Sequence, residues 1–383
     1  MELAKREAPW FQDAGVKKVI FLTVAFKLTA LIVMAMGAFF LPFRFDNYFA
    51  NFHFPPNQLP DFWTGFKTWD AQHYLYLATF GYTPHLMCDA FYPLFPGLIH
   101  LFGFLFLRNY FLTGLLLSNL FTVTAMVFMY RIVREFYDES VAFNACLLLL
   151  AFPTGFFLGL IYSDSLFLML ATAFFYFEMK NKKGLYLLCA FFLPLARPIG
   201  ILVMIPIVFK IFRENRERKL EKISKVILCS LLGLITYFLV MRIFAGGMMA
   251  GFEAQNDYRI GKSFYCLFHP IQWFLNNFVH VKLSLNSPGT SLSDRLFFLI
   301  YFILLIESWK WLPPHLWVYV LAVGLISGMS GDLTSFMRYM VVIFPIFITM
   351  AIRFKSSLRY LAWGSAIVQI LFIFLHSIND WVA

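Results

Sequence analysis

The chain has 383 residues, of which 61% are hydrophobic, 20% aromatic and 14% charged. Ordinary soluble domains contain roughly 45–50% apolar residues, so this composition excludes a water-soluble fold. The formal net charge is +10, but the basic residues gather beside apolar stretches and form no separate basic domain. This distribution argues against nucleic-acid binding.

Apolar windows follow one another along the chain, near 19–42, 91–108, 111–130, 141–162, 164–179, 184–211, 226–246, 295–309, 315–330, 336–353 and 358–376. A helix needs roughly 17–25 residues to cross a bilayer, so the windows predict an all-α polytopic bundle of about 10–11 transmembrane helices. The bundle forms a single domain over 1–383. The first window runs to Leu41-Pro42 without a cleavage pattern, so we expect it to remain as a span.

Basic residues gather in four groups, which by the positive-inside rule mark cytoplasmic loops and can contact lipid headgroups. The groups are Lys5, Arg6, Lys17 and Lys18; Lys180, Lys182 and Lys183; Lys210, Arg213, Arg216, Arg218, Lys219, Lys222 and Lys225; and Arg353, Lys355 and Arg359. Two long segments, 43–90 and 247–294, contain few basic residues and are therefore predicted as outer loops. The aromatic residues of the first loop predict short interfacial helices.

Two places in the chain disturb a simple series of crossings. The windows between 91 and 183 do not alternate correctly with the charged groups, and a half-helix or re-entrant piece around Pro153-Thr154-Gly155 would repair the count. The 184–211 window contains Leu193-Pro194 and Arg197-Pro198. It is therefore either one kinked span or two short arms that meet at Arg197.

The densest polar cluster in the predicted outer loops is Trp69-Asp70-Ala71-Gln72-His73-Tyr74. On a helix, Asp70, His73 and Tyr74 share one face by their three- and four-residue spacing. A carboxylate beside an imidazole could deprotonate an acceptor hydroxyl. The alternative is that Asp70 is only a solvated or capping residue of an amphipathic helix.

Several stretches carry a family resemblance and occur in family order through most of the chain. They are Thr68-Trp69-Asp70-Ala71-Gln72-His73-Tyr74 with Gly81-Tyr82, Phe91-Tyr92-Pro93, Tyr162-Ser163-Asp164-Ser165-Leu166-Phe167, Ala196-Arg197-Pro198-Ile199-Gly200, the 252–259 segment, and Ser335-Phe336-Met337-Arg338-Tyr339. They resemble mannosyltransferases similar to phosphatidylinositol-glycan class V enzymes, in the GT-C superfamily. The chain departs from the family pattern at Asp164 (Glu in the family), Pro198-Ile199 (Ser-Asn) and Tyr258 (Trp).

The resemblance implies a GT-C-like bundle and an inverting transfer of mannose or a similar hexose from a polyprenyl- or dolichyl-phosphate donor. Asp70 is then the general base, assisted by His73. Arg338 and Arg197 are the candidates to neutralise the donor phosphate, because an arginine near an apolar span needs an anion or carbonyls. Further substrate-binding candidates are Trp69, Asp164, Gln255, Arg259 and Tyr339.

Structural alternatives remain open for the charged candidates. Arg338 could pair with Asp332, and Arg197 with Asp164. Asp164 could bind sugar hydroxyls, or it could cap a helix that begins at Ser165.

No Asp-x-Asp motif, Cys-x-x-Cys pair or metal-ligand spacing occurs, so no metal or other cofactor is expected. One disulfide, between Cys88 and Cys266, is conceivable but not required. The predicted partners are the lipid-phosphate sugar, a glycolipid, glycan or protein acceptor, and membrane lipids. We expect a multi-pass protein of a bacterial or archaeal cell membrane rather than the ER membrane, with its active site on the non-cytoplasmic face.

Two other functions remain open. A secondary transporter or flippase could use the same buried charges as a substrate pathway, although such proteins more often show repeat symmetry and mid-span charges. A ligase or polymerase of lipid-linked glycans would differ in using a diphosphate donor.

Overall fold

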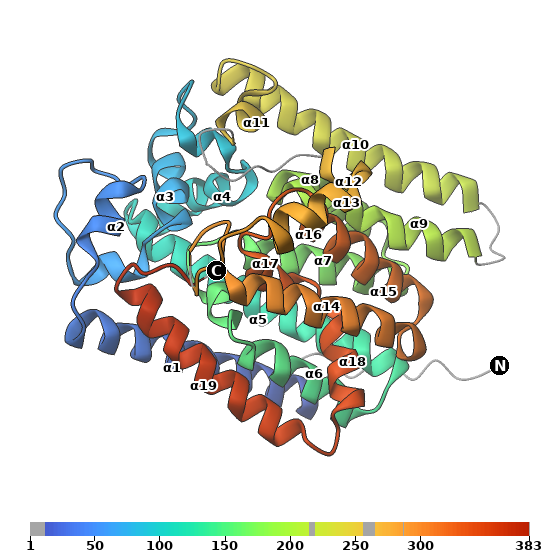
Figure 1. Cartoon of the computed structure of the whole chain (residues 1–383). Coiled ribbons are helices and arrows are strands. Elements are labelled where there is room, and N and C mark those ends of the chain that lie inside the picture. The colour runs from blue at the N-terminus through green and yellow to red at the C-terminus, as the bar shows by residue number, and fades with distance from the viewer. Residues whose placement is uncertain (1–11, 214–218, 256–264, 286, 383) are drawn as a thin grey trace.

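The computed structural model describes residues 12–213, 219–255, 265–285 and 287–382. These residues form helices, turns and loops, and the one β contact among them is an isolated bridge between Ser284 and Ser291. The all-α fold predicted from the apolar windows is therefore confirmed. Figure 1 shows the helices packed as one bundle.

Nineteen α-helices are present in the described residues. They are α1 (Ala14–Phe40), α2 (Phe45–Ala50), α3 (Asp70–Phe80), α4 (Leu94–Gly103), α5 (Tyr110–Phe136), α6 (Glu139–Ala151), α7 (Asp164–Met179), α8 (Lys183–Ala196), α9 (Met204–Arg213), α10 (Lys219–Phe244), α11 (Ala250–Ala254), α12 (Tyr265–Phe268), α13 (Pro270–Phe274), α14 (Leu292–Trp311), α15 (Pro314–Tyr319), α16 (Ile326–Met329), α17 (Phe336–Tyr339), α18 (Pro345–Arg353) and α19 (Leu358–Ser377).

Shorter 3₁₀- and π-helical turns join them. They are η1 (Phe62–Phe66), η2 (Met87–Ala90), η3 (Phe104–Phe106), η4 (Gly155–Gly159), η5 (Pro198–Val203), η6 (Leu275–Val279), η7 (Val320–Leu325) and η8 (Met340–Val342).

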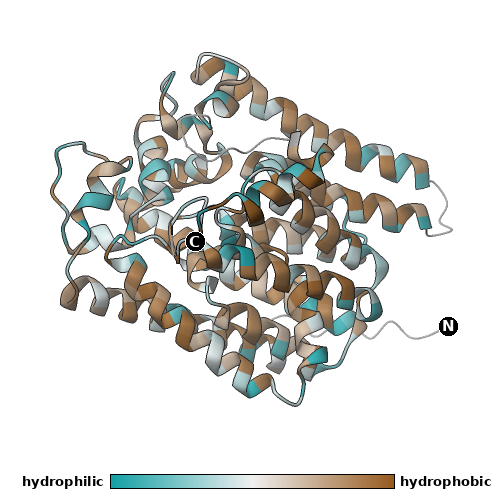
Figure 2. Ribbon diagram, viewed as in Figure 1, coloured by the Kyte–Doolittle hydropathy of each residue, from teal (hydrophilic) through white to brown (hydrophobic). Residues whose placement is uncertain are grey.

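Four of the helices are long and apolar enough to cross a membrane: α1, α5, α10 and α19. The pair 336–342 and 345–353, bent by 88°, makes a fifth if it counts as one broken span. Large apolar side chains on the outer helices are exposed, such as Phe21 at 76%, Ile243 at 69% and Trp363 at 67%. Figure 2 shows these helices as largely hydrophobic, and the chain is an integral membrane protein.

Each remaining apolar window also contains helix: the window 295–309 lies in the 20-residue α14, and the others contain shorter pieces. Four further apolar stretches of 10–17 residues are helical: 94–106, 139–151, 183–196 and 314–329. The predicted total of ten or eleven crossings stays a prediction, because pieces of this length are shorter than the roughly 20 residues that a helix needs to cross a bilayer alone.

Polar side chains set the starts of several helices. The side chain of Asp13 accepts from the backbone N–H groups of Gly15 and Val16 at the start of α1. Asn109, Asp138 and Ser291 cap α5, α6 and α14 in the same way. Such caps satisfy N–H groups that have no partner inside the helix, and so the helix boundaries follow from local sequence.

The two interruptions expected from sequence both appear. α8 ends at Ala196, Arg197 adopts an extended conformation, and the chain continues as η5 and α9. The window thus forms two short arms that meet at Arg197, as one alternative predicted. α6 ends at Ala151, and residues 152–163 form η4 and irregular backbone that is buried throughout. An interruption was expected around Pro153-Thr154-Gly155, as a half-helix or a re-entrant piece; its path through the membrane stays a prediction.

Side chains from surrounding spans satisfy the carbonyl groups of this irregular segment. Lys27 of α1 donates to the carbonyl of Gly155 at 3.0 Å. In α5, Asn119 donates to the carbonyl of Gly159 at 3.0 Å and Thr122 to that of Leu158 at 2.5 Å. Gln369 of α19 donates to the carbonyls of Leu150 at 2.9 Å and Phe152 at 2.5 Å. Non-helical backbone at membrane depth is tolerated only where such partners exist. The segment 152–163 therefore occupies one defined position, immediately before Asp164.

Basic residues from three of the four groups meet at one end of the bundle. Ion pairs join them to acidic residues at the ends of neighbouring helices: Lys18–Glu139, Lys180–Glu135 and Lys210–Glu178. In Figure 1 the facing ends of α9 and α10 lie on the right, whereas α2 and α3 of the first predicted outer loop lie on the left. Three basic groups thus share one end and the first predicted outer loop lies at the other, whereas α12 and α13 of the second predicted loop lie nearer the middle of the bundle.

Candidate active site

Asp164 is the centre of a buried ionic cluster. Its side chain is 0% exposed, and its Oδ1 accepts from Arg197 Nη1 at 2.5 Å. Its Oδ2 accepts from Arg338 Nε at 3.1 Å and from Arg338 Nη2 at 3.0 Å. Asp164 is the first residue of α7, and its side-chain oxygens bind these arginines rather than backbone N–H groups of the helix. A role as helix cap is therefore wrong, and the carboxylate instead orients two guanidinium groups.

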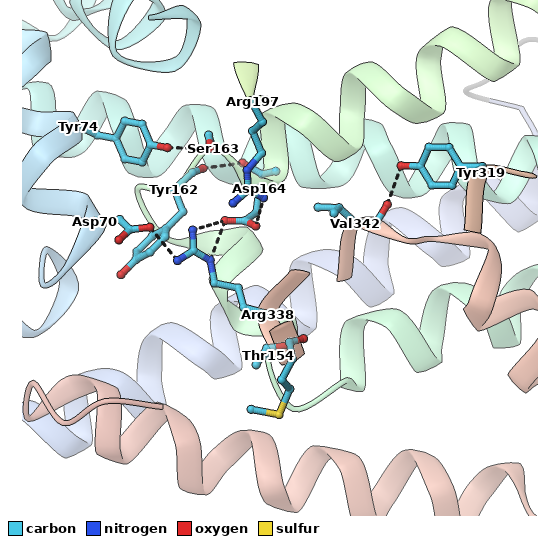
Figure 3. Close-up of polar contacts among 12 residues, drawn as sticks. Asp70, Tyr74, Thr154, Tyr162, Ser163, Asp164, Arg197, Tyr319, Arg338 and Val342 are labelled. Atoms are coloured by element: carbon cyan, nitrogen blue, oxygen red, sulfur yellow. Dashed lines mark hydrogen bonds and ion pairs between the residues drawn. The ribbon is translucent and has the colours of Figure 1, made fainter. Parts of the chain in front are cut away.

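Arg338 extends the cluster to Asp70. Its Nη1 lies 2.7 Å from Asp70 Oδ2, and the Asp70 side chain is 28% exposed. Figure 3 shows Arg338 between Asp70 and Asp164, and Asp164 between Arg338 and Arg197. The suggested alternative pairing of Arg338 with Asp332 is not the one observed. The alternative pairing of Arg197 with Asp164 is confirmed.

Aromatic rings surround the two guanidinium groups. Arg338 lies over the rings of Tyr162, at 4.5 Å, and Phe157, at 5.3 Å. Arg197 lies 5.1 Å from the ring of Tyr339. Cation–π contacts of this kind hold an arginine in place while leaving its N–H groups free for anions. Tyr339, a predicted binding residue, therefore supports Arg197.

The backbone before Asp70 is strained. Trp69 has φ 55° and ψ −126°, in a region that residues with a side chain rarely adopt. Such a conformation costs of order 1–3 kcal/mol and persists only where the surroundings enforce it. Two contacts do so here: Tyr162 Oη donates to the Thr68 carbonyl at 3.2 Å, and Tyr74 Oη donates to Ser163 Oγ at 2.7 Å. They fix α3 against the residues that precede Asp164 (Figure 3).

A second strained residue precedes Arg338. Ser335 has φ 62°, and α17 begins directly after it. The fully buried carboxylate of Asp294, in the first turn of α14, accepts from the N–H of Ser335 at 3.2 Å and of Met337 at 2.9 Å. Asp294 thus caps the short helix that carries Arg338. Sequence analysis missed this residue, because nothing local distinguishes it from an ordinary first-turn acid.

A small pocket lies at the Asp70–Arg338 pair. Its walls are Trp69, Asp70, Phe157, Tyr162, Arg338, His376, Trp381 and Val382, and its volume is about 10 Å³. That is about the space of one water molecule. Asp70 is thus the carboxylate of the cluster that has access to a cavity, whereas Asp164 is enclosed.

The cluster combines two carboxylates with two guanidinium groups, and its formal charges cancel. Asp164 forms ion pairs with both arginines, whereas Asp70 is partly exposed and forms one ion pair, with Arg338. An incoming anion could take the Arg338 Nη1 contact from Asp70 without disturbing Asp164.

His73, predicted to assist Asp70, lies in an aromatic stack. Its ring is parallel to Phe52 at 4.3 Å and to Phe91 at 4.4 Å. Burial lowers the pKa of His73 to about 3, so the imidazole stays neutral at physiological pH. A neutral ring between two phenyl rings is well suited to packing. The predicted catalytic role of His73 stays a prediction.

The other predicted binding residues are distributed differently. Trp69 lines the pocket. Gln255 follows α11, which packs against η2 and α10, and no described contact joins it to Arg338. Arg259 lies outside the described residues. The residues that sequence analysis missed at the pocket are Tyr162, His376 and Trp381; Tyr162 stands beside Asp164 in the resembling motif, which was the one available signal.

Neither a disulfide nor a metal site appears in the part of the chain that the structure describes. The five cysteines are free, including Cys88 and Cys266. No group of three or more His, Cys, Asp or Glu side chains lies close enough to hold a metal ion in the described ranges. The expectation of metal-independent chemistry stays a prediction.

Comparison with known proteins finds similarity only at the level of structure. No family model matches the sequence, and no curated protein matches it. Two solved structures of the Archaeoglobus fulgidus oligosaccharyltransferase are similar, one in complex with zinc and sulfate (11% identity, TM-score 0.48) and one tethered to an acceptor peptide (12% identity, TM-score 0.47). The similarity covers 96% and 98% of this chain. It covers 53% and 56% of the two oligosaccharyltransferase chains, so this chain spans about half of their length.

Proposed function

We propose that this chain is an inverting glycosyltransferase of the GT-C type. It moves mannose or a similar hexose from a polyprenyl- or dolichyl-phosphate donor to a glycolipid, glycan or protein acceptor, on the non-cytoplasmic face of the membrane. The observation that carries the proposal is the sharing of Arg338 between the enclosed Asp164 and the partly exposed Asp70 beside a pocket. The mannose specificity rests on the motif resemblance.

Arg338 has the properties of a binding group for a lipid monophosphate. It lies in the bent segment of a span, is 5% exposed and keeps its charge, so its field is strong and directed. A donor phosphate that takes the Nη1 contact now made to Asp70 would pair with Arg338 and leave the Asp70 carboxylate free to accept a proton. Asp164 holds Arg338 and Arg197 in position during this exchange.

Asp70 then acts as the general base. The acceptor oxygen attacks the anomeric carbon, its proton passes to the Asp70 carboxylate, and the bond from the anomeric carbon to the phosphate oxygen breaks. The electron pair leaves with the phosphate, whose charge Arg338 neutralises. Attack from the face opposite the phosphate inverts the anomeric configuration.

The test measures sugar transfer by the purified protein from a panel of polyprenyl-phosphate sugars. It compares the wild type with the variant Asp70→Asn. The amide keeps the size of the side chain but cannot accept the proton, so we expect transfer to fall by on the order of 10²–10⁴-fold while thermal stability stays close to wild type. Asp46→Asn, which changes an exposed acid of the same loop, is the matched control.

Two results would contradict the proposal. Full transfer by Asp70→Asn removes this carboxylate from the mechanism. If the wild-type protein transfers no sugar but moves solutes across liposomes, the chain is a transporter.

A further inference from the structure

The segment that follows α19 forms one wall of the pocket at Asp70. Trp381 and Val382 line it together with Trp69 and Arg338. Val382 is 2% exposed, and the Trp381 ring packs edge-on against Trp69 at 5.1 Å and 80°. Residues from the far end of the sequence thus complete a site whose charged groups come from α3 and α17.

Two polar groups in this wall have no partner. The indole N–H groups of Trp69 and Trp381 are buried, and neither donates a hydrogen bond to any described residue. A buried donor without an acceptor costs about 1–3 kcal/mol. Two such donors in one pocket, beside a carboxylate, suit a ligand that supplies hydrogen-bond acceptors.

The chemistry of the wall fits the ring of a sugar. A hexose hydroxyl accepts from an indole N–H and donates to a carboxylate, and the apolar face of the ring packs against aromatic side chains. The isoprenoid chain of the donor has no acceptor for either N–H, and the phosphate is the natural partner of Arg338.

The pocket is closed in this structure. Its volume of about 10 Å³ is far below the roughly 300–1,000 Å³ of ligand pockets. Three contacts hold residues 378–380 against the chain at the start of α2. They are Arg44 N–H to the Ile378 carbonyl (2.8 Å), Asn47 to the Asn379 carbonyl (3.2 Å) and Arg44 to Asp380 (3.8 Å).

One of these contacts, the ion pair between Arg44 and Asp380, is weak. The Arg44 side chain is 62% exposed, and exposed ion pairs contribute about 0–1 kcal/mol. Displacement of residues 378–382 would enlarge the pocket on the side of Trp381 without moving Asp164.

We infer that Trp381 is a substrate-positioning residue: residues 378–382 open to admit the donor, and the Trp381 and Trp69 N–H groups then donate to hydroxyls of the transferred sugar. This inference rests on the proposed glycosyl transfer and names the group that holds the sugar ring. The wall of the sugar subsite is thereby assigned to the segment after α19.

The experiment compares Trp381→Phe with wild type in transfer from polyprenyl-phosphate mannose. Phenylalanine keeps an aromatic ring and removes the N–H, so the apparent KM for the donor should rise by about tenfold, the effect of one hydrogen bond, with a smaller change in kcat. Trp363→Phe, at an exposed position of α19, is the matched control and should leave KM unchanged. Trp69→Phe removes the second N–H independently, so it decides the question if Trp381→Phe does not fold.

The outcomes separate the two claims. If wild type transfers mannose and the Trp381 and Trp363 variants have the same KM, the sugar-positioning role is wrong and the proposed function stands. If wild type transfers no sugar from any lipid-phosphate donor, the proposed function fails and the role of Trp381 fails with it.

Discussion

Two buried arginines, Arg338 and Arg295, are used in opposite ways. They are 5% and 4% exposed. Arg295 donates to three backbone carbonyls, Nε to Asn277 at 2.6 Å, Nη1 to Ser291 at 2.8 Å and Nη2 to Gly289 at 2.7 Å. Arg338 instead binds two carboxylates, one of which borders a pocket.

The difference separates a structural arginine from one suited to a substrate. Carbonyl groups cannot move away without unfolding the loops that carry them, so the contacts of Arg295 are permanent. A partly exposed carboxylate can give up its contact to another anion at little cost. Burial and charge alone therefore do not identify a phosphate-binding arginine; the identity of its partners does.

Among the changes that test this difference between the two arginines, the largest effect is expected when each is exchanged for lysine. Arg338→Lys keeps the charge but loses the fork that reaches Asp70 and Asp164 together, so transfer should fall by on the order of 10²-fold, as for loss of one transition-state donor. Arg295→Lys should lower the melting temperature, because buried carbonyls lose donors at about 1–3 kcal/mol each.

Transfer assays and thermal unfolding of both variants provide the measurement. Activity per folded molecule should be normal for Arg295→Lys. The distinction between a structural Arg295 and a substrate-binding Arg338 would be wrong if Arg295→Lys lost transfer without losing stability, or if Arg338→Lys transferred at the wild-type rate.

A smaller effect is expected for Asp294→Asn. The amide has a single acceptor oxygen where the carboxylate binds the N–H groups of Ser335 and Met337. The variant should lose about 1–3 kcal/mol of stability and should raise the KM for the donor, since Arg338 is carried by the helix that Asp294 caps. Asp332→Asn is the control. Asp332 accepts a hydrogen bond from the Thr334 N–H in the same turn, and this change likewise replaces a carboxylate with an amide. Equal KM values for the two variants would show that Asp294 does not position Arg338.

The smallest effect is expected for His73→Phe. The variant keeps the aromatic stack, so transfer at neutral pH should stay within about tenfold of wild type, or ~1.4 kcal/mol. Folded His73 stays neutral to about pH 3, whereas the unfolded chain binds a proton near pH 6.5. The unfolded state therefore binds more protons below pH 6.5, and wild type loses stability there relative to the variant, by up to about 1.4 kcal/mol per pH unit.

Melting temperatures of both proteins between pH 7 and pH 5 test this expectation. A constant difference across this range would mean that His73 is not held neutral. Abolished transfer at pH 7 would restore His73 to the catalytic mechanism.

Much of the fold could be predicted from local patterns. Every apolar window contains helix, and the two irregular places, before Asp164 and at Arg197, were marked by proline and by conflicting charge. These features are local, because hydropathy and proline act on the chain where they occur. The candidate site was predicted in part: Asp70, Asp164, Arg197 and Arg338 were named, but their pairing was left open.

The contacts that define the site could not be predicted in the same way. Asp164 and Arg338 are separated by 174 residues in sequence, and no spacing rule connects them. Asp294 and Trp381 carry no motif, and they gained importance only from the backbone and side chains packed against them. His73 was given weight because it neighbours Asp70 in sequence, whereas its ring lies between Phe52 and Phe91.

By itself the sequence determined that the chain is a helical membrane protein, where several helices begin and two of the breaks lie, and which charged residues stand out against an apolar background. Hydropathy, capping and proline geometry decide these properties over a few residues at a time. Only the tertiary structure decided that Arg338 joins an enclosed carboxylate to an accessible one, and that the segment after α19 closes the pocket beside them. Those relations depend on the packing of distant helices, because ion pairs and cavities exist only between side chains that folding brings together.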